Sequence, residues 1–248
     1  MKKVIFLSFA MILTQNLFCQ YFSFGLNGGY GSYYLDDLKK FQTEMKEYLS
    51  FPVEETERFP AWFNYQSSIE YNFKKGKVLG LRAAYYTTGG RIHMADYSGE
   101  YRFDMIINGY SVGVLGKNEL LKSEKTSVYA SVATGVFSTS LSMKEFLKIN
   151  GIDSTSSSNN FRALSYFVHP SVGIRYRLLK QVSLELNAGF EFVDDGKLHL
   201  GKKEYLVHQD GSYVRTNWSG LRASAGIYFN IVSFKTIKTD PDNFSGLK

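Results

Sequence analysis

The chain has 248 residues, a formal net charge of +6 and a single cysteine, and 16% of its residues are aromatic. Beyond the N-terminal segment no apolar run approaches the roughly 18 residues of a membrane-spanning helix, which excludes a helical membrane protein. The basic residues form no stripe, so nucleic acid is not expected as a partner.

The N-terminal segment has the pattern of a secretory signal peptide. Two lysines precede an apolar stretch at 4–13, which is too short for a spanning helix. We expect cleavage after Cys19, with Gln20 as the new N-terminus. The alternative is a lipoprotein acylated at Cys19, but Phe18 stands where such sites usually have a small residue. After cleavage no cysteine remains, so no disulfide is expected.

The chain that follows contains eight segments in which apolar and polar residues alternate, as they do in β-strands. Each is at least as long as the roughly 9 to 11 residues that a tilted strand needs to cross a bilayer. The expected strands are 21–34, 61–74, 77–90, 101–117, 125–140, 161–178, 181–195 and 213–231.

The connections between these segments alternate between short and long. The long ones are 35–60, 91–100, 141–160 and 196–212. Short turns at one rim and long loops at the other are typical of bacterial outer-membrane barrels, whose short turns face the periplasm. The sequence therefore predicts an all-β fold: an eight-stranded antiparallel up-and-down transmembrane β-barrel with both termini in the periplasm.

The composition of the polar faces indicates which side of the barrel meets lipid. In 181–195, Leu184 and Leu186 point one way and Ser183 and Glu185 the other. A soluble barrel of the lipocalin type would turn its apolar face inward and cover its outside with charges. Here the polar faces hold mostly Gly, Ser and Asn with a few ions, which suits a crowded lumen. We therefore expect the apolar face to meet lipid.

The ions on these polar faces are expected to pair across the lumen, because an unpaired buried ion costs several kcal/mol by order of magnitude. Such pairing would close the pore to anything much larger than water or a small ion. The predicted lumen polar network comprises Glu70, Arg82, His169, Arg175, Arg177, Glu185, Glu191 and Arg222.

Aromatic residues gather near both ends of the expected strands, as anchoring at two membrane interfaces predicts. The predicted girdle comprises Tyr33, Tyr34, Trp62, Phe63, Tyr71, Phe73, Tyr176, Phe190, Phe192, Tyr228 and Phe229. The segment 101–117 fits the alternation least well. Asn108 falls in its apolar set with Met105 and Ile107 opposite, and a β-bulge is expected there.

Residues 35–50 change from a strand period to a helical period. Leu35, Leu38 and Met45 fall on one helical face, and Asp36 and Asp37 suit the first turn. The sequence predicts a short amphipathic helix in the first extracellular loop. It either rests on the barrel mouth or acts as a lid or a partner-binding element.

One residue pair raises the possibility of catalysis. His169 and Ser171 resemble the His-x-Ser pair of outer-membrane lipid A deacylases, in which a Glu on the following strand completes a triad. Glu185 or Glu191 would take that role. Those enzymes expose the triad to lipid, whereas the alternation here places His169 and Ser171 in the lumen, where a hydrogen-bond network is the preferred interpretation.

No catalytic, cofactor or metal site is predicted elsewhere. The remaining histidines lack the spacing of metal ligands and are expected to be solvated in loops. They are His93, His199 and His208.

With its segment FSFGLNGGYG, its long first loop and closing strands such as SVGIRYRL and ASAGIYFNI, the chain resembles the small outer-membrane β-barrel proteins of Bacteroidota. Within them it is similar to the group of OmpA-type barrels, OmpX and PorT-like proteins. The resemblance covers 20–232 and implies architecture and location, with no active-site residues. The expected division is a signal peptide at 1–19, the barrel at 20–232 and a periplasmic tail at 233–248.

The favoured hypothesis for function is a monomeric, non-enzymatic barrel in the cell outer membrane. It would act as an envelope scaffold or as a surface-binding module through its extracellular loops, surrounded by outer-membrane lipid. Unknown surface or periplasmic proteins are its expected partners. The alternatives are a narrow pore or accessory component of a secretion or uptake system, and a barrel enzyme that acts on lipid.

Overall fold

The computed structural model describes residues 21–232 except 57–58, 74–75, 151–153 and 202–203. The predicted signal peptide and the predicted tail lie outside the described residues. Within the part of the chain that is described, no helix combines the length and the apolar character needed to cross a membrane.

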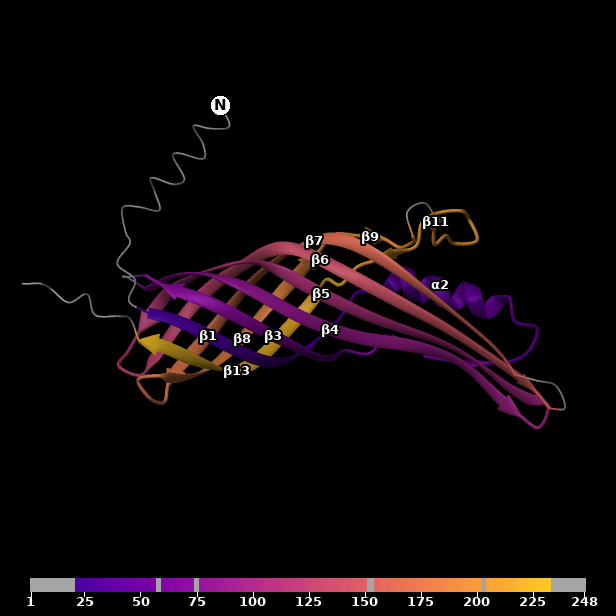
Figure 1. Cartoon of the computed structure of the whole chain (residues 1–248), viewed down its shortest axis with the longest axis horizontal. Coiled ribbons are helices and arrows are strands. Elements are labelled where there is room, and N and C mark those ends of the chain that lie inside the picture. Colours follow the sequence, from indigo (N-terminus) through magenta and orange to yellow (C-terminus); the bar gives the residue numbers. More distant parts are fainter. Residues whose placement is uncertain (1–20, 57–58, 74–75, 151–153, 202–203, 233–248) are drawn as a thin grey trace, which may run out of the picture.

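Eight antiparallel strands form a closed ring (Figure 1). They are β1 (Tyr21–Gly31), β3 (Trp62–Asn72), β4 (Lys77–Asp96), β5 (Gly99–Lys122), β6 (Thr126–Ile149), β7 (Thr155–Arg177), β8 (Val182–Val193) and β13 (Gly220–Val232). Each strand pairs with the next one along the chain in this set, and β13 pairs with β1 from Tyr21↔Val232 to Gly31↔Arg222. Closure leaves the ring without an edge and satisfies its backbone groups internally. The predicted eight-stranded antiparallel barrel is confirmed.

The connections from β3 to β4, from β5 to β6 and from β7 to β8 are short, and they lie at the end of the ring where β1 begins and β13 ends. We call this the short-turn end. At the other end, β4 to β7 continue well beyond the ring as a four-stranded antiparallel sheet, drawn at the right of Figure 1. We call this sheet the extension; it comprises 87–96, 99–108, 140–149 and 155–162.

The extension corrects the predicted boundaries, because 91–100 and 141–160 are mostly strand and not long loops. The turn between β4 and β5 is tight: Asp96 accepts hydrogen bonds from the backbone of Ser98 (2.8 Å) and of Gly99 (3.2 Å). The sequence pattern predicts loops here, because these residues lie between the segments with clear alternation. Continuous pairing with neighbouring strands outweighs that weak local signal.

The helix α2 (Asp36–Glu47) lies in the first long connection, beside the extension (Figure 1). It buries Leu38, Phe41 and Gln42, and its two first-turn aspartates suit the positive end of the helix dipole. The predicted amphipathic helix in the first long connection is confirmed. The same connection adds β2 (Glu54–Glu55), which pairs with β4.

The described residues of the last long connection, 194–219, form four two-residue strands. They are β9 (Gly196–Lys197), β10 (His199–Leu200), β11 (Glu204–Tyr205) and β12 (Arg215–Thr216). We call α2 and this connection together the cap, because both cover the barrel mouth at the extension end.

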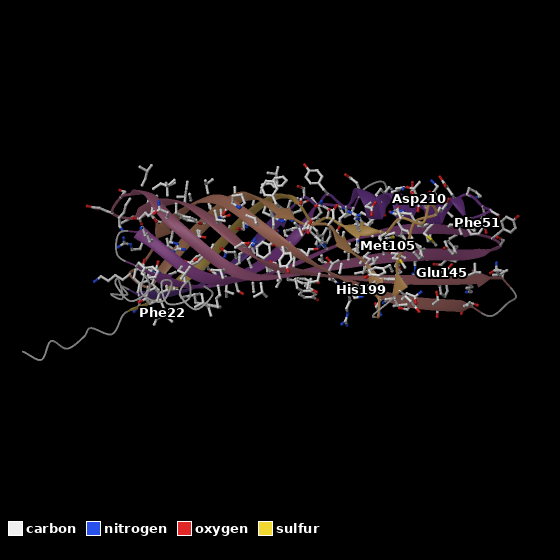
Figure 2. All side chains as sticks on the ribbon, turned by 90° about the horizontal axis from the view of Figure 1, so that it is seen from above. Phe22, Phe51, Met105, Glu145, His199 and Asp210 are labelled. Atoms are coloured by element: carbon white, nitrogen blue, oxygen red, sulfur yellow. The ribbon has the colours of Figure 1, made fainter. Side chains whose placement is uncertain are left out.

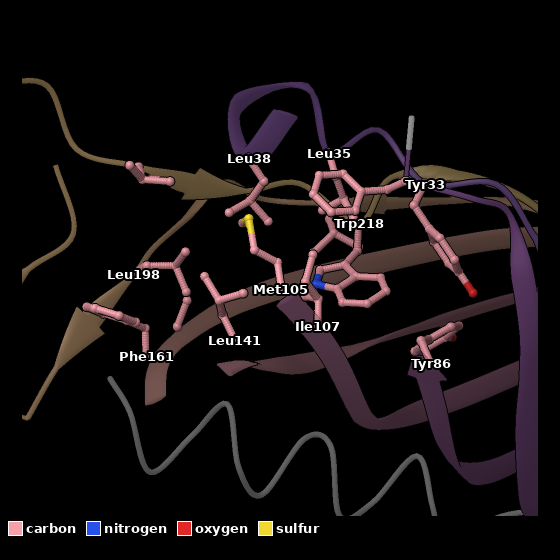
Figure 3. Close-up of a cluster of buried hydrophobic side chains, with 14 of the residues drawn as sticks. Tyr33, Leu35, Leu38, Tyr86, Met105, Ile107, Leu141, Phe161, Leu198 and Trp218 are labelled. Carbon is pink, nitrogen blue, oxygen red and sulfur yellow. The ribbon is translucent and has the colours of Figure 1, made fainter. Parts of the chain in front are cut away.

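The interior beneath the cap is an apolar core (Figure 3). Trp218 from the last connection is fully buried among side chains of β4, β5 and β6, and its indole nitrogen donates to Thr139 Oγ1 at 3.0 Å. The core includes Leu38, Tyr86, Met105, Ile107, Phe137, Leu141 and Leu198.

This core explains why the predicted bulge near Asn108 was wrong. The register runs without a break through Thr87↔Asn108 and Asn108↔Ser140. Met105 and Ile107 point into the apolar core, and Asn108 points outward, where it accepts a hydrogen bond from Tyr85 at 2.9 Å. The prediction assumed a polar lumen along the whole barrel, whereas the interior becomes apolar toward the extension.

Candidate functional site

The outer surface of the ring is an apolar belt. Leu186, for example, is 62% exposed, while its neighbour Glu185 on β8 is buried. Figure 2 shows such side chains standing out along the barrel. Soluble monomers rarely expose contiguous apolar patches larger than a few hundred Å². Each of the eight strands of the ring contributes at least one exposed aliphatic residue: Leu26, Ile69, Leu81, Val112, Val132, Val172, Leu186 and Ile227.

Aromatic side chains border this belt at both ends. At the short-turn end Tyr71 packs edge-on against Phe22 (5.0 Å between ring centroids) and Phe73 (4.7 Å). At the other end Phe190 contacts Phe192 (4.6 Å) and Tyr34 (6.3 Å). Of the other predicted girdle residues, these are exposed: Trp62, Phe63, Tyr176 and Phe229.

Two predicted girdle residues lie elsewhere, which corrects the expectation for both. Tyr228 is only 2% exposed and Tyr33 only 9%, since both rings point into the barrel. Each covers a cation there: the Arg175 guanidinium lies 4.1 Å from the Tyr228 ring, and that of Arg222 lies 4.8 Å from the Tyr33 ring. Their position near strand ends suggested a girdle, but the direction of each side chain decided its environment.

The lumen toward the short-turn end contains a layer of four buried ions from four strands. Lys117 Nζ lies 2.7 Å from Glu70 Oε1 and 3.0 Å from Glu185 Oε1. Arg175 reaches the same two carboxylates, at 2.9 Å from Glu70 and 2.8 Å from Glu185. Two cations and two anions make the layer neutral. We call it the lower ion layer.

A second set of buried ions lies further from the short-turn end, between the lower ion layer and the apolar core. We call it the upper ion layer. Glu191 accepts from Arg82 (3.2 Å), from Arg222 (3.1 Å) and from the hydroxyl of Tyr86 (3.0 Å). The structure thus brings six of the eight predicted network residues into two layers. Sequence analysis missed Lys117, which stands at the last position of the expected strand 101–117.

The remaining two network residues join neither layer. His169 is buried, and its Nε2 finds no hydrogen-bond partner among the described residues. Arg177 is exposed at the short-turn end.

The geometry around Ser171 gives no support to a catalytic triad. Its hydroxyl lies 2.6 Å from that of Ser131 and accepts from Asn187 at 3.2 Å. Glu185 and Glu191, the candidate acids, are bound to cations. In the described part of the chain no hydrogen bond joins Ser171 to His169. The residues described also contain no group of three or more His, Cys, Asp or Glu arranged to hold a metal ion.

Little space remains inside the barrel. The cavity between the two ion layers measures about 30 Å³, which is room for one or two waters. The apolar core and the cap fill the interior above it. The described residues therefore form a plugged barrel.

Polar contacts between α2 and the last long connection hold the two parts of the cap together. His208, expected to be solvated, is only 3% exposed. Its Nδ1 lies 2.8 Å from Glu44 Oε2 and its Nε2 3.2 Å from Asp37 Oδ1, so both ring nitrogens meet carboxylates of α2. Nearby, Lys40 reaches Asp210 at 3.2 Å. No local pattern in the sequence signals these contacts, because the partners are 164 to 171 positions apart.

The fold and the site define a small closed β-barrel whose outer surface is apolar and whose interior is filled by paired ions and apolar side chains. No protein-family model matches the chain, and no curated protein matches its sequence.

Three solved structures that match the fold of this chain are the following. Neisserial surface protein A is 10% identical, with a TM-score of 0.45, over 85% of this chain and 97% of that chain. Ail, the attachment invasion locus protein of Yersinia pestis, is 11% identical, with a TM-score of 0.33, over 85% and 97%. The outer membrane protease OmpT from Escherichia coli is 9% identical, with a TM-score of 0.35, over 88% and 99%. With scores and identities this low, we base the function of this chain on its own residues.

Proposed function

We propose that the chain is an integral β-barrel protein of the bacterial outer membrane, without enzyme activity, which presents the extension and the cap at the cell surface as a binding module or envelope scaffold. The observation that carries the proposal is the apolar belt on a closed ring. Water would meet this belt in a soluble protein, whereas the hydrocarbon of a bilayer matches it.

The height of the belt supports a membrane-spanning barrel. On β7 the outward residues run from Leu164 to Tyr176, and all of them, Pro170 included, are exposed and apolar or aromatic. At about 3.3 Å per residue and a tilt near 40°, this stretch covers roughly 30 Å. The hydrocarbon core of a bilayer is about 30 Å thick, and outer-membrane barrels have apolar bands of about 25 Å.

The two ends of the barrel support one orientation. Short turns face the periplasm in known outer-membrane barrels, and longer segments face the outside. Here the short-turn end also carries the first and last described residues, Tyr21 and Val232. The proposal therefore places both chain ends in the periplasm, and the extension outside the cell.

A pore is disfavoured by the filled interior. An ion that crossed the barrel would have to break the contacts of Glu70 and Glu185 with Lys117, then those of Glu191 with Arg82, and then displace the apolar core. Breaking one buried ion pair costs about 3 to 5 kcal/mol. We therefore propose a surface role for this barrel and not transport.

Gel mobility tests the proposal. Protein from purified outer membranes is loaded with and without boiling in detergent, and a closed barrel is expected to migrate faster unboiled. A soluble periplasmic or secreted protein with no heat shift would contradict the membrane assignment.

Two further measurements separate the proposed role from the pore. Trypsin added to intact cells is expected to cut the extension, which offers Lys144 and Lys148, if it lies outside. The purified protein is expected to show no steady conductance in a planar bilayer, and stable single-channel currents would favour the pore.

A further inference from the structure

The mouth of the barrel at the short-turn end is a cavity of about 400 Å³. We call it the mouth pocket. Strand ends of β1, β5, β6, β7, β8 and β13 surround it, so it opens along the barrel axis and not toward the apolar belt. Its volume lies within the range of about 300 to 1,000 Å³ found for small-molecule sites. Five of its lining residues are cations and one is an anion: Lys122, Lys125, Arg175, Arg177, Lys180 and Glu119.

Two of these cations are already compensated. Lys122 pairs with Glu119 at 3.2 Å, and Arg175 forms the floor of the pocket while bound to Glu70 and Glu185 of the lower ion layer. The other three are not: among the described residues, no carboxylate lies within 4.0 Å of the charged groups of Lys125, Arg177 or Lys180. Three positive charges are therefore gathered around one cavity.

The pairing of β6 with β7 places two of these cations directly opposite each other. Ser127 faces Arg175 and Thr126 faces Tyr176, and one position further on the backbone N–H of Arg177 donates to the carbonyl of Lys125 at 2.7 Å. Like charges opposite each other on neighbouring strands destabilise a sheet. An anion bound between them would remove this repulsion.

The uncharged groups around the mouth pocket also suit an anion. Hydroxyl groups of Ser123, Ser127 and Ser183 and the amide of Asn230 line it and supply further hydrogen-bond donors. An arginine binds two oxygens of a phosphate at once, and lysines contribute as point charges. We propose that the mouth pocket binds a soluble, phosphate-bearing solute. This inference rests on the proposed function in one respect: the orientation of the barrel places the mouth pocket in the periplasm, so the solute would enter from there.

Calorimetry with the full chain tests this site. The protein, refolded into phosphatidylcholine nanodiscs, is titrated with sodium pyrophosphate in about 50 mM salt, where exposed charges are weakly screened. We expect saturable binding. The triple variant Lys125→Gln, Arg177→Gln, Lys180→Gln is expected to bind at least about tenfold more weakly, because charge-assisted contacts are lost.

A matched control removes the same charges at the opposite end of the molecule. Lys144→Gln, Lys148→Gln, Arg162→Gln also replaces two lysines and one arginine, all in the extension, and is expected to bind like the unmodified protein. Equal binding by the two triple variants, or no saturable binding by the unmodified protein, would overturn the proposal.

The same titration in phosphatidylglycerol nanodiscs distinguishes the two sources of phosphate. Unchanged binding supports a soluble solute, because the pocket faces the barrel axis. Loss of pyrophosphate binding in this lipid would overturn the assignment to a soluble solute and would assign the site to a lipid phosphate group.

Stability of the variants provides a second readout. Each triple variant is first checked for its faster unboiled gel band. Since removal of Lys125 and Arg177 relieves repulsion, the site variant without ligand is expected to withstand heating at least as well as the unmodified protein. If the triple variant fails to fold, Arg177→Gln alone is used, with an expected loss of affinity that is smaller than that of the triple variant but measurable. A heat-shifted outer-membrane protein that binds no pyrophosphate would overturn this site and leave the proposed function intact. A protein absent from the outer membrane would overturn the proposed function and leave the site to be titrated on the soluble protein, so the two failures are distinguishable.

Discussion

Replacement of Lys117 by methionine is expected to destabilise the barrel by about 3 to 5 kcal/mol, the cost of breaking a buried ion pair. The Lys117 side chain is only 5% exposed, and its ammonium group lies 2.7 and 3.0 Å from two carboxylates. Methionine has a similar length, so the change removes the charge and leaves little new space. Glu70 and Glu185 would then share Arg175 as the one cation of their layer.

A double variant separates charge balance from packing. Lys117→Met combined with Glu185→Gln leaves Glu70 with Arg175, one anion with one cation, and is expected to recover more than half of the lost stability. The assay is unfolding in urea in detergent micelles, followed by the fraction of the faster unboiled gel band.

A loss below about 1 kcal/mol for Lys117→Met would refute the reasoning, since it would show that water already screens this layer. A double variant less stable than the single one would refute it as well, because balance of charge would then not be what stabilises the layer.

Three further predictions concern the outside and the cap. Leu186→Arg on the lipid-facing side is expected to cost about 2 to 4 kcal/mol in refolding into bilayers, measured by urea titration. His208→Ala removes the buried ring that joins Asp37 and Glu44 of α2 to the last connection, so trypsin is expected to cut the cap faster while the boiled and unboiled bands stay distinct. Hydrogen bonds from Ser212, and then Lys40, lower the pKa of Asp210. A lowered pKa in the folded state stabilises the cap above the ordinary aspartate pKa of about 4, and this contribution is lost as pH falls from there toward the folded-state pKa. A protease that is active in acid, such as pepsin, should therefore cut the cap faster as pH falls below about 4, and Asp210→Asn should remove this dependence.

Different outcomes would contradict each of these predictions. Equal refolding of Leu186→Arg and of Leu147→Arg, a control on the extension, would argue against a lipid-facing belt. Unchanged cleavage of His208→Ala would show that the apolar core alone holds the cap. Acid sensitivity that persists in Asp210→Asn would assign it to another group.

Much of the barrel could be predicted because strand alternation is a local property. Val182, Leu184 and Leu186 on one side and Ser183 and Glu185 on the other show the face of each residue from its neighbours alone. The same local rule failed at Asn108, where the expected bulge depended on the polarity of an interior that other strands create. It also missed the extension, because the serine and asparagine residues of 155–160 have low strand propensity and are held by pairing with β6.

The candidate site was predictable in its composition but not in its contacts. The lumen ions could be recognised from their faces, yet Lys117 was overlooked and His208 was expected in solvent. Whether Tyr228 borders lipid or covers Arg175 depends on the direction in which its ring points, which the position near a strand end does not show.

The sequence by itself determined the class of fold, the outward apolar face and the helix in the first long connection, because periods of 2 and 3.6 residues act within a few positions of the chain. Only the tertiary structure decided which ions pair, where the lumen turns apolar, and that the cap joins α2 to a loop about 170 residues later. These outcomes follow from the closure of the ring, which brings distant side chains together in a space where each must find a partner or an apolar neighbour.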